Sequence, residues 1–337
     1  MVTLKEIASS VGVSTATVSR VLNFDTSLSI TEGKRRAIIE TAEALNYETP
    51  RARNRRGQPG VSKIALLHFL RPEQELIDPY YVALRLGIER RCQALQIEAM
   101  KVYHTEARPD LTLLQSAQGA IVVGRHSAAE VAYISQSALP LVFADFAPLD
   151  FDCDVVLCDL GQAMQKQLTA LEAAGYARIA FIGWSETDGT VKSDDEKRLS
   201  AFRDWMAVRK RLDLDLIRIG GNSEQDGYRL TRDILAHTTP EAIVTCNDNM
   251  AVGAYRAIAE RGLNIPGDIA VASFNDISAA QFLHPPLSTV HLPAEEIGET
   301  AVDLLVERIG GRDLAKQVTL ASTLRWRRST RPIPEVK

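Results

Sequence analysis

Apolar residues in most of this chain follow two alternating patterns, which predict strands and helices in turn. Beyond residue 62, short apolar runs predict strands at residues 64–70, 97–103, 120–124, 141–145, 155–159, 179–184, 214–220, 242–247 and 269–274. Stretches with helical spacing separate them, for example at residues 81–95, 200–211, 226–236 and 250–261. Such alternation is typical of parallel sheets with right-handed crossovers. The two successive series predict an α/β fold with two similar lobes, each built on a doubly wound parallel sheet.

The first 48 residues show a different pattern, in which apolar positions recur only at helical spacing. A first helix is expected to begin in a capping box formed by Thr3 and Glu6 and to stop at Gly12. Ser14 is an N-cap for a second helix, and residues 31–47 predict a third. The side chains expected to face inward are Ile7, Ala8, Val11, Ala16, Val18, Val21, Leu22, Ile38, Ala42 and Leu45. Two short helices joined by a tight turn indicate a helix-turn-helix domain over residues 1–48.

The second of these helices carries short polar side chains and an arginine on its outer side: Ser14, Thr15, Thr17, Ser19, Arg20 and Asn23. Such side chains on an exposed helix suit DNA phosphates and base edges. A helical hairpin that only packs against the rest of the protein is the alternative. Net charge favours DNA, because residues 1–60 carry a formal charge of +3 and the remainder carries −7.

An arginine-rich connector over residues 49–61 follows the helical domain, with basic side chains at Arg51, Arg53, Arg55 and Arg56. Its composition fits a solvated linker. Beside a DNA-reading helix, we expect it to order on phosphates or in a minor groove. Residues 62–337 would then hold the two lobes, the first at about 62–160 plus 290–325 and the second at about 161–289.

Composition and motifs exclude several classes of protein. No apolar run is long enough to cross a bilayer and no signal peptide is evident, so a cytoplasmic protein is expected. Metal-site spacing and a Cys-x-x-Cys pair are absent among Cys92, Cys153, Cys158 and Cys246, so buried reduced thiols are expected. No metal or cofactor is expected. No catalytic residue is predicted, since the chain lacks Gly-x-Gly-x-x-Gly, Gly-x-Ser-x-Gly and His-Glu-x-x-His motifs. An α/β enzyme and a sugar-binding protein without DNA stay open as alternatives.

Polar and aromatic residues follow the predicted strands. They include the segment Asp78-Pro-Tyr-Tyr81, the strand ends at Asp145, Trp184, Asn247 and Asn275, and Arg198 at the start of a helix. Each alone is more typical of a helix cap or turn. Together they should meet in one cleft, because ligands bind at the carboxyl ends of parallel strands. Carboxylates, amides and an arginine bind vicinal hydroxyls, and aromatic faces cover a sugar ring. The predicted ligand-binding residues are Tyr80, Tyr81, Asp145, Trp184, Arg198, Asn247 and Asn275.

The chain resembles the lactose and galactose repressor family. The resemblance rests on the motifs Thr3-Leu-Lys-Glu-Ile-Ala, Gly12-Val-Ser-x-x-Thr-Val-Ser-Arg-Val-Leu-Asn23 and Leu45-Asn-Tyr47, followed by the two-lobed region. Residues 77–89, 257–266 and 282–290 are most similar to the branch of the family typified by the evolved β-galactosidase repressor. This second similarity implies a galactoside as the effector.

The resemblance implies a DNA-binding transcriptional repressor whose affinity for a palindromic operator is controlled allosterically by a small sugar in the cleft. A homodimer is implied, with a tetramer as the alternative. Thr15 and Ala16 fall on base-reading positions, and the neighbouring positions that contact the backbone or adjacent bases are Ser14, Thr17, Ser19, Arg20 and Asn23. Thr3, at the start of the first helix, is also expected to bind DNA. Asp145, Arg198, Asn247 and Asn275 fall on effector-binding positions, with Tyr80 or Tyr81 on the segment that contacts the sugar ring.

Two positions depart from the family pattern. The connector has no leucine to wedge into the minor groove, so reading of a narrow minor groove by arginine is expected in its place. Asn275 stands where many sugar-binding relatives have an aspartate. An amide both donates and accepts hydrogen bonds, so a hydroxyl contact is retained while the identity of the sugar stays open.

Overall fold

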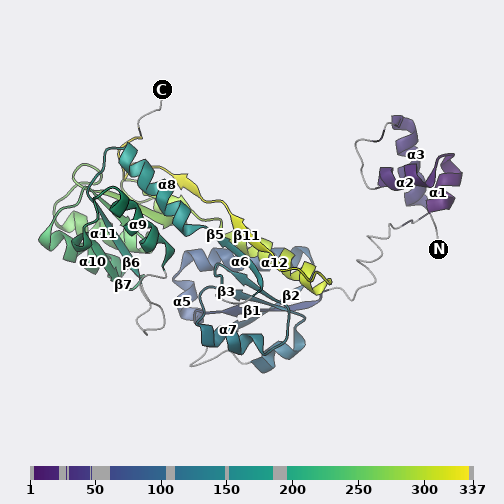
Figure 1. The fold of residues 1–337 in the computed structure, drawn as a ribbon, viewed down its shortest axis with the longest axis horizontal. Helices are drawn as coiled ribbons and strands as arrows, with labels where there is room; N and C mark the ends of the chain where they lie inside the picture. The colour runs from purple at the N-terminus through teal and green to yellow at the C-terminus, as the bar shows by residue number, and fades with distance from the viewer. Residues whose placement is uncertain are drawn as a thin grey trace. The chain divides into compact units, whose positions relative to one another are not determined.

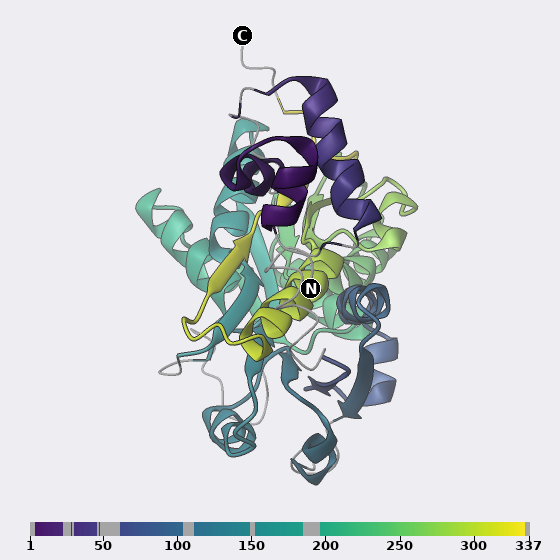
Figure 2. The ribbon, with the colours of Figure 1, turned by 90° about the vertical axis from the view of Figure 1, so that its right-hand side faces the viewer.

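The structure, a computed structural model, describes residues 4–22, 28, 30–45, 47, 61–103, 111–148, 152–184 and 196–333. The chain divides into two compact units, Met1–Val61 and Ser62–Lys337. Figure 1 and Figure 2 show the helices and strands of both units from two sides. Within the described residues, no helix is long and apolar enough to span a membrane.

The N-terminal unit contains the three predicted helices, α1 (Leu4–Val11), α2 (Thr15–Leu22) and α3 (Glu32–Ala44). Their buried core consists of Ile7, Ala8, Val18, Val21, Ile38 and Ala42. Gly12 ends α1 at a φ of +67°, a conformation that glycine adopts without strain. Ser14 Oγ accepts a hydrogen bond from the Thr17 amide at 3.1 Å, which confirms the predicted N-cap of α2. The expected capping box of Thr3 and Glu6 includes Thr3, which lies outside the described residues.

Two side chains expected in this core lie at the surface. Ala16 is exposed, because α2 buries the opposite face through Val18 and Val21. Leu45 is 37% exposed, because α3 ends at Ala44 and does not reach residue 47. Tyr47 packs against the core instead, and its amide donates to the Ala42 carbonyl at 2.8 Å.

The first lobe of the larger unit is a parallel sheet with the strand order β11-β5-β4-β3-β1-β2. Its strands are β1 (Lys63–His68), β2 (Glu98–Tyr103), β3 (Ala120–Val123), β4 (Leu141–Ala144), β5 (Asp154–Cys158) and β11 (Gln317–Leu320). Its helices are α5 (Pro72–Leu76), α6 (Pro79–Ala94), the 3-10 helix η1 (Leu111–Ser116), α7 (Ala128–Ser135) and α12 (Ala294–Ile309). Gly87 and Gly298 let α6 and α12 touch backbone to backbone, because a Cβ at either glycine would overlap the other helix.

The second lobe has the strand order β12-β10-β9-β8-β6-β7, and only β12 runs antiparallel to its neighbour among the described strands. Its strands are β6 (Ile179–Trp184), β7 (Ile217–Gly220), β8 (Ala242–Thr245), β9 (Ala270–Asn275), β10 (Ser288–His291) and β12 (Thr323–Arg325). Its helices are α8 (Leu160–Ala173), α9 (Lys197–Val208), α10 (Glu224–His237) and α11 (Asp248–Glu260), with the 3-10 helices η3 (Leu214–Leu216) and η4 (Ser278–Gln281). Helices α8 and α9 pack as one pair, and α10 and α11 pack as another.

The two doubly wound lobes are confirmed, with three differences in detail. Residues 214–216, expected at the start of a strand, form η3. The expected lobe limits placed residues 290–325 in the first lobe, but β12 pairs with β10 in the second sheet. The chain therefore passes between the lobes three times, after β5, after β10 and after β11. The end of β10 also belongs to the second lobe, because its register with β9 extends to His291.

Candidate functional site

A cavity of about 530 Å³ lies between the two lobes, at the carboxyl ends of their strands. All seven residues predicted to bind a ligand line it. The first lobe contributes Tyr80, Tyr81 and Asp145, and the second contributes Trp184, Arg198, Asn247 and Asn275. The remaining lining residues are Phe69, Leu70, Gln74, Ile77, Asp78, Leu160, Gly221, Asn222, Ser223, Glu224, Asn249 and Leu292.

Asp145 is the centre of the first-lobe wall. It follows β4, and its two carboxylate oxygens accept hydrogen bonds from Tyr80 Oη at 2.8 Å and from Tyr81 Oη at 3.1 Å. Both tyrosines stand in the first turn of α6, where Asp78 is the N-cap and accepts from the Tyr80 amide at 3.1 Å. Burial raises the pKa of Asp145 to about 6, although the two tyrosine hydroxyls oppose the rise.

Arg198 is the positive centre of the second-lobe wall. Its side chain is buried, its Nε donates to Glu196 Oε1 at 2.7 Å, and its Nη1 donates to the carbonyl of Cys246. Burial lowers the pKa of this guanidinium, but the neighbouring Glu196, Cys246 and Asp145 together hold it above its ordinary value. The opposite charges of Arg198 and Asp145 interact across the cavity and influence each other's pKa.

The two asparagines of the second lobe differ in how they are held. Asn247 is the N-cap of α11, with its Oδ1 accepting from the Met250 amide at 2.8 Å and its Nδ2 donating to the Asn222 carbonyl at 3.0 Å. The cap that is typical of an asparagine after a strand is therefore present. Asn275 ends β9 at a φ of +105°, a region that side chains rarely adopt and that clusters at binding sites.

The mouth of the cavity is formed by residues that the strand pattern did not predict. On the first lobe, Gln74 lies within α5 and Ile77 is its C-cap, and Asn222, Glu224 and Asn249 stand on the second lobe. Asn249 Nδ2 donates to the Ile77 carbonyl at 3.3 Å, so a hydrogen bond joins the two lobes at the mouth of the cavity. Asn249 could have been found from sequence, because it lies in the same first helical turn as the predicted Asn247. A helix as short as α5 leaves no apolar periodicity to find.

The predicted DNA-binding residues lie partly within the described residues. Ser14, the N-cap of α2, is exposed, as are Thr15, Ala16 and Arg20 on α2, whereas Thr17 and Ser19 are partly buried. The Ser14 and Thr17 hydroxyls are hydrogen-bonded to each other at 2.8 Å. The other predicted positions, which are Thr3, Asn23, Arg51, Arg53, Arg55 and Arg56, lie outside the described residues. The face of α2 opposite the buried Val18 and Val21 is exposed, so this face is accessible to a partner.

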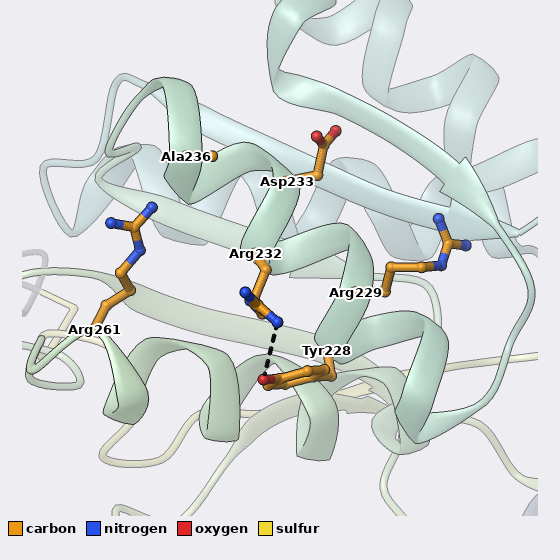
Figure 3. A pocket seen from close by; sticks show the side chains of 6 residues that line it. All are labelled: Tyr228, Arg229, Arg232, Asp233, Ala236 and Arg261. Carbon is orange, nitrogen blue, oxygen red and sulfur yellow. Dashed lines mark hydrogen bonds between the residues drawn. The ribbon is translucent and has the colours of Figure 1, made fainter.

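A second hollow, on α10 and the end of α11, has a different character (Figure 3). It belongs to one lobe only. Arg229 pairs with Asp226 at 3.2 Å, Asp233 pairs with Arg218, and Arg232 donates to the Tyr228 hydroxyl at 3.4 Å. These groups satisfy one another, so we assign no ligand to this hollow. Across the part of the chain that the structure describes, no three His, Cys, Asp or Glu side chains gather as a metal site.

Known proteins resemble this chain along its whole length. Residues 3–50 match the model described as bacterial regulatory proteins, lacI family, and residues 168–330 match the periplasmic binding protein-like domain. The HTH-type transcriptional regulator GalR of Lacticaseibacillus casei is 36% identical over 335 residues, covering 98% of this chain and 100% of the relative. The lactose operon repressor of Rhizobium radiobacter is 59% identical over 108 residues, covering 32% of this chain and 96% of the relative.

The fold also has solved counterparts. A structure of the lac repressor dimer bound to operator and the anti-inducer ONPF aligns with a TM-score of 0.70 at 22% identity. The alignment covers 98% of this chain and 99% of that chain. At this identity the likeness supports the arrangement of a helical N-terminal region followed by two α/β lobes.

Proposed function

Since this chain belongs to the LacI family of bacterial DNA-binding transcriptional regulators, we propose that it is a repressor whose operator affinity is controlled by a small sugar bound between its lobes. The full-length relatives are regulators and not enzymes, so the site is a ligand-sensing site. The α/β enzyme expected as an alternative is thereby set aside.

The observation that carries the sugar proposal is the chemistry of the lobe cavity. It combines the half-buried carboxylate of Asp145, the buried guanidinium of Arg198 and the carboxamides of Asn247 and Asn275 with the aromatic side chains of Tyr80, Tyr81 and Trp184. Vicinal hydroxyls bind carboxylates, amides and arginine through paired hydrogen bonds, and the apolar face of a sugar ring packs on aromatic rings. The cavity holds charges of both signs, which suits a neutral polyhydroxylated ligand better than an ion.

A galactoside is the class of sugar that we propose. Two observations support it, namely the name of the lactose operon repressor that shares 59% identity over 108 residues and the name of the GalR relative. Lactose is itself a galactoside. The seven lining residues predicted from sequence are the proposed contacts, with Asp145 and Arg198 placed to bind ring hydroxyls from opposite lobes.

The DNA side of the proposal rests on α2. Its exposed Thr15 and Ala16 would face the major groove, where a methyl or hydroxyl group makes a contact weaker than a bidentate amide or guanidinium. We propose a homodimer that presents two such helices to a palindromic operator, with the connector arginines binding phosphates or the minor groove. The site of action is then the cytoplasm, where the operator DNA is.

Control would follow from lobe closure. A ligand that binds both lobes changes how they close, and the lobes are continuous with the connector that starts before Ser62. A coupling free energy of about 1–3 kcal/mol changes operator affinity by roughly 5- to 150-fold. Operator DNA must change sugar affinity by the same factor, because the coupling is reciprocal.

The first prediction concerns matched sugars. We expect isothermal titration calorimetry of the full chain to detect binding of lactose and galactose, and much weaker binding of cellobiose. Cellobiose is the matched comparison, since it differs from lactose only in the configuration of one hydroxyl. Fluorescence anisotropy with DNA selected from a pool of palindromes should then show a change in operator affinity when lactose is added. The sign of the change distinguishes an inducer from a corepressor.

Two variants locate the site. Asn275→Gly removes the amide without straining a backbone at positive φ, so it should weaken lactose binding while leaving the protein folded. Arg232→Ala, in the second hollow, should leave lactose binding unchanged. If Arg232→Ala weakened binding and Asn275→Gly did not, the lobe cavity would be the wrong site.

A further inference from the structure

The short helix α5 forms one side of the cavity mouth, yet apolar burial does not hold it in place. Leu70, Gln74 and Ile77, within it and beside it, line the cavity. Leu76 is 72% exposed and Ile77 is 70% exposed. The buried side chain of α5 is Glu75, which is 1% exposed. A five-residue helix has little intrinsic stability, so its position depends on the interactions of this carboxylate.

Glu75 is hydrogen-bonded by two side chains from other elements of the first lobe, and a third lies near it without a hydrogen bond. Arg85 of α6 donates from Nε to Glu75 Oε1, and Tyr103 at the end of β2 donates its hydroxyl to Oε2 at 2.9 Å. His68 at the end of β1 lies with Nε2 3.7 Å from Oε1. A buried carboxylate is tolerated only when its oxygens are paired in this way.

The partners of Glu75 are themselves fixed. Arg85 Nη1 also donates to both carboxylate oxygens of Glu89 at 3.1 Å, and Lys101 pairs with Glu89 at 2.8 Å. His68 Nδ1 accepts from the Leu70 amide at 3.1 Å, so the imidazole proton is on the Nε2 side, toward Glu75. Burial lowers the pKa of His68 to about 4, which keeps the ring neutral at pH 7.

We propose that Glu75 is a positioning residue that fixes the α5 wall and thereby selects the part of the effector that lies at the cavity mouth. This inference rests on the proposed sugar-sensing function. The deep residues Asp145 and Arg198 bind the ring that enters first, whereas the exposed Gln74 and Ile77 face whatever is attached to that ring. Glu75 touches no ligand and acts through the placement of α5.

The test measures the binding of lactose and of galactose to full-chain variants at two carboxylates, Glu75 and Glu89. Glu75→Gln keeps the size of the side chain but removes the ionic anchor, so amides of residues 74–77 should exchange with solvent faster. Lactose binding should weaken about tenfold, while galactose binding changes less than about threefold. The reason is that α5, once loosened, has to be ordered again only around a group attached to the first ring, which lactose has and galactose lacks. Tyr103→Phe, which removes one donor, should give a smaller change in the same direction.

Glu89→Gln is the matched control, because Glu89 shares Arg85 but lies on α6 and pairs with Lys101 of β2. It should leave exchange at α5 and the lactose-to-galactose ratio unchanged. Unchanged exchange at α5 in Glu75→Gln, or an equal loss for both sugars, overturns the positioning role. A wild-type protein that binds neither sugar overturns the proposed effector class instead, and the exchange comparison still decides whether Glu75 holds α5.

Discussion

The two walls of the lobe cavity are held by different kinds of bond. In the second lobe, Asn247 is fixed by two backbone groups, and Arg198 is fixed by a backbone carbonyl and by Glu196 at the start of its own helix. In the first lobe, Asp145 is held by the hydroxyls of Tyr80 and Tyr81. The shape of the second wall is therefore part of the fold, whereas the first wall depends on side-chain pairs that substitution can retune. The first lobe is where we expect specificity to be set.

The largest effect is expected for Arg198→Met. It leaves the buried carboxylate of Glu196 without its cation, and breaking a buried ion pair in this way lowers the free energy of unfolding by about 3 kcal/mol. Lactose binding should be lost as well. Urea unfolding without sugar measures the first effect and calorimetry measures the second.

Arg209→Met is the matched control for that variant, since Arg209 is the C-cap of the same helix and pairs with the part-exposed Glu172 at 3.1 Å. It should cost no more than about 1 kcal/mol. Equal losses of stability in the two variants would contradict the idea that the second wall is part of the core.

A smaller effect is expected from pH. The pKa of Asp145 is raised to about 6, and a carboxylate accepts ligand hydroxyls best when it is ionised. Protonation should therefore weaken lactose binding by about tenfold between pH 7.5 and pH 5, and binding near pH 6 should release protons. Titrations across this range in two buffers of different ionisation enthalpy measure both.

In Asp145→Asn the side chain cannot titrate, so lactose affinity should be weaker at pH 7.5 and nearly constant down to pH 5. If Asp145→Asn kept the pH dependence of the wild type, another group would be responsible for that dependence. The contrast drawn between the two walls of the cavity would then be weaker.

The smallest effect is expected at Asn247. Asn247→Ala removes the N-cap of α11 and should lower the free energy of unfolding by about 1 kcal/mol, together with some loss of sugar binding. Asn247→Ser keeps a capping oxygen, so it should restore stability without restoring the lost amide contact. Thermal unfolding and calorimetry on both variants separate the cap from the ligand contact. Restoration of both properties by serine would mean that the amide contributes nothing to binding.

The sequence predicted the strands and the cavity wall for the same reason. A buried parallel strand is a continuous apolar run, and the polar residue where the run stops lies at the carboxyl edge of a sheet; Asp145, Asn247 and Asn275 were found in this way. Features decided by tertiary packing were not predicted. Leu45 has helical spacing with Ile38 and Ala42 but lies beyond the end of α3, and α5 is held by a charge that its local sequence does not reveal.

Neither lobe is a continuous segment, and this fact bears on how the protein is made. The edge strands β11 and β12, one in each sheet, come after all the other strands in the chain. A ribosome delivers the chain from its N-terminus, so β5 and β10 stand at the edges of their sheets until residues 317–325 have emerged. The helical unit can fold early, but the two lobes must finish together. A single ribosomal delay before β11 would thus leave both β5 and β10 without their partner strands at once.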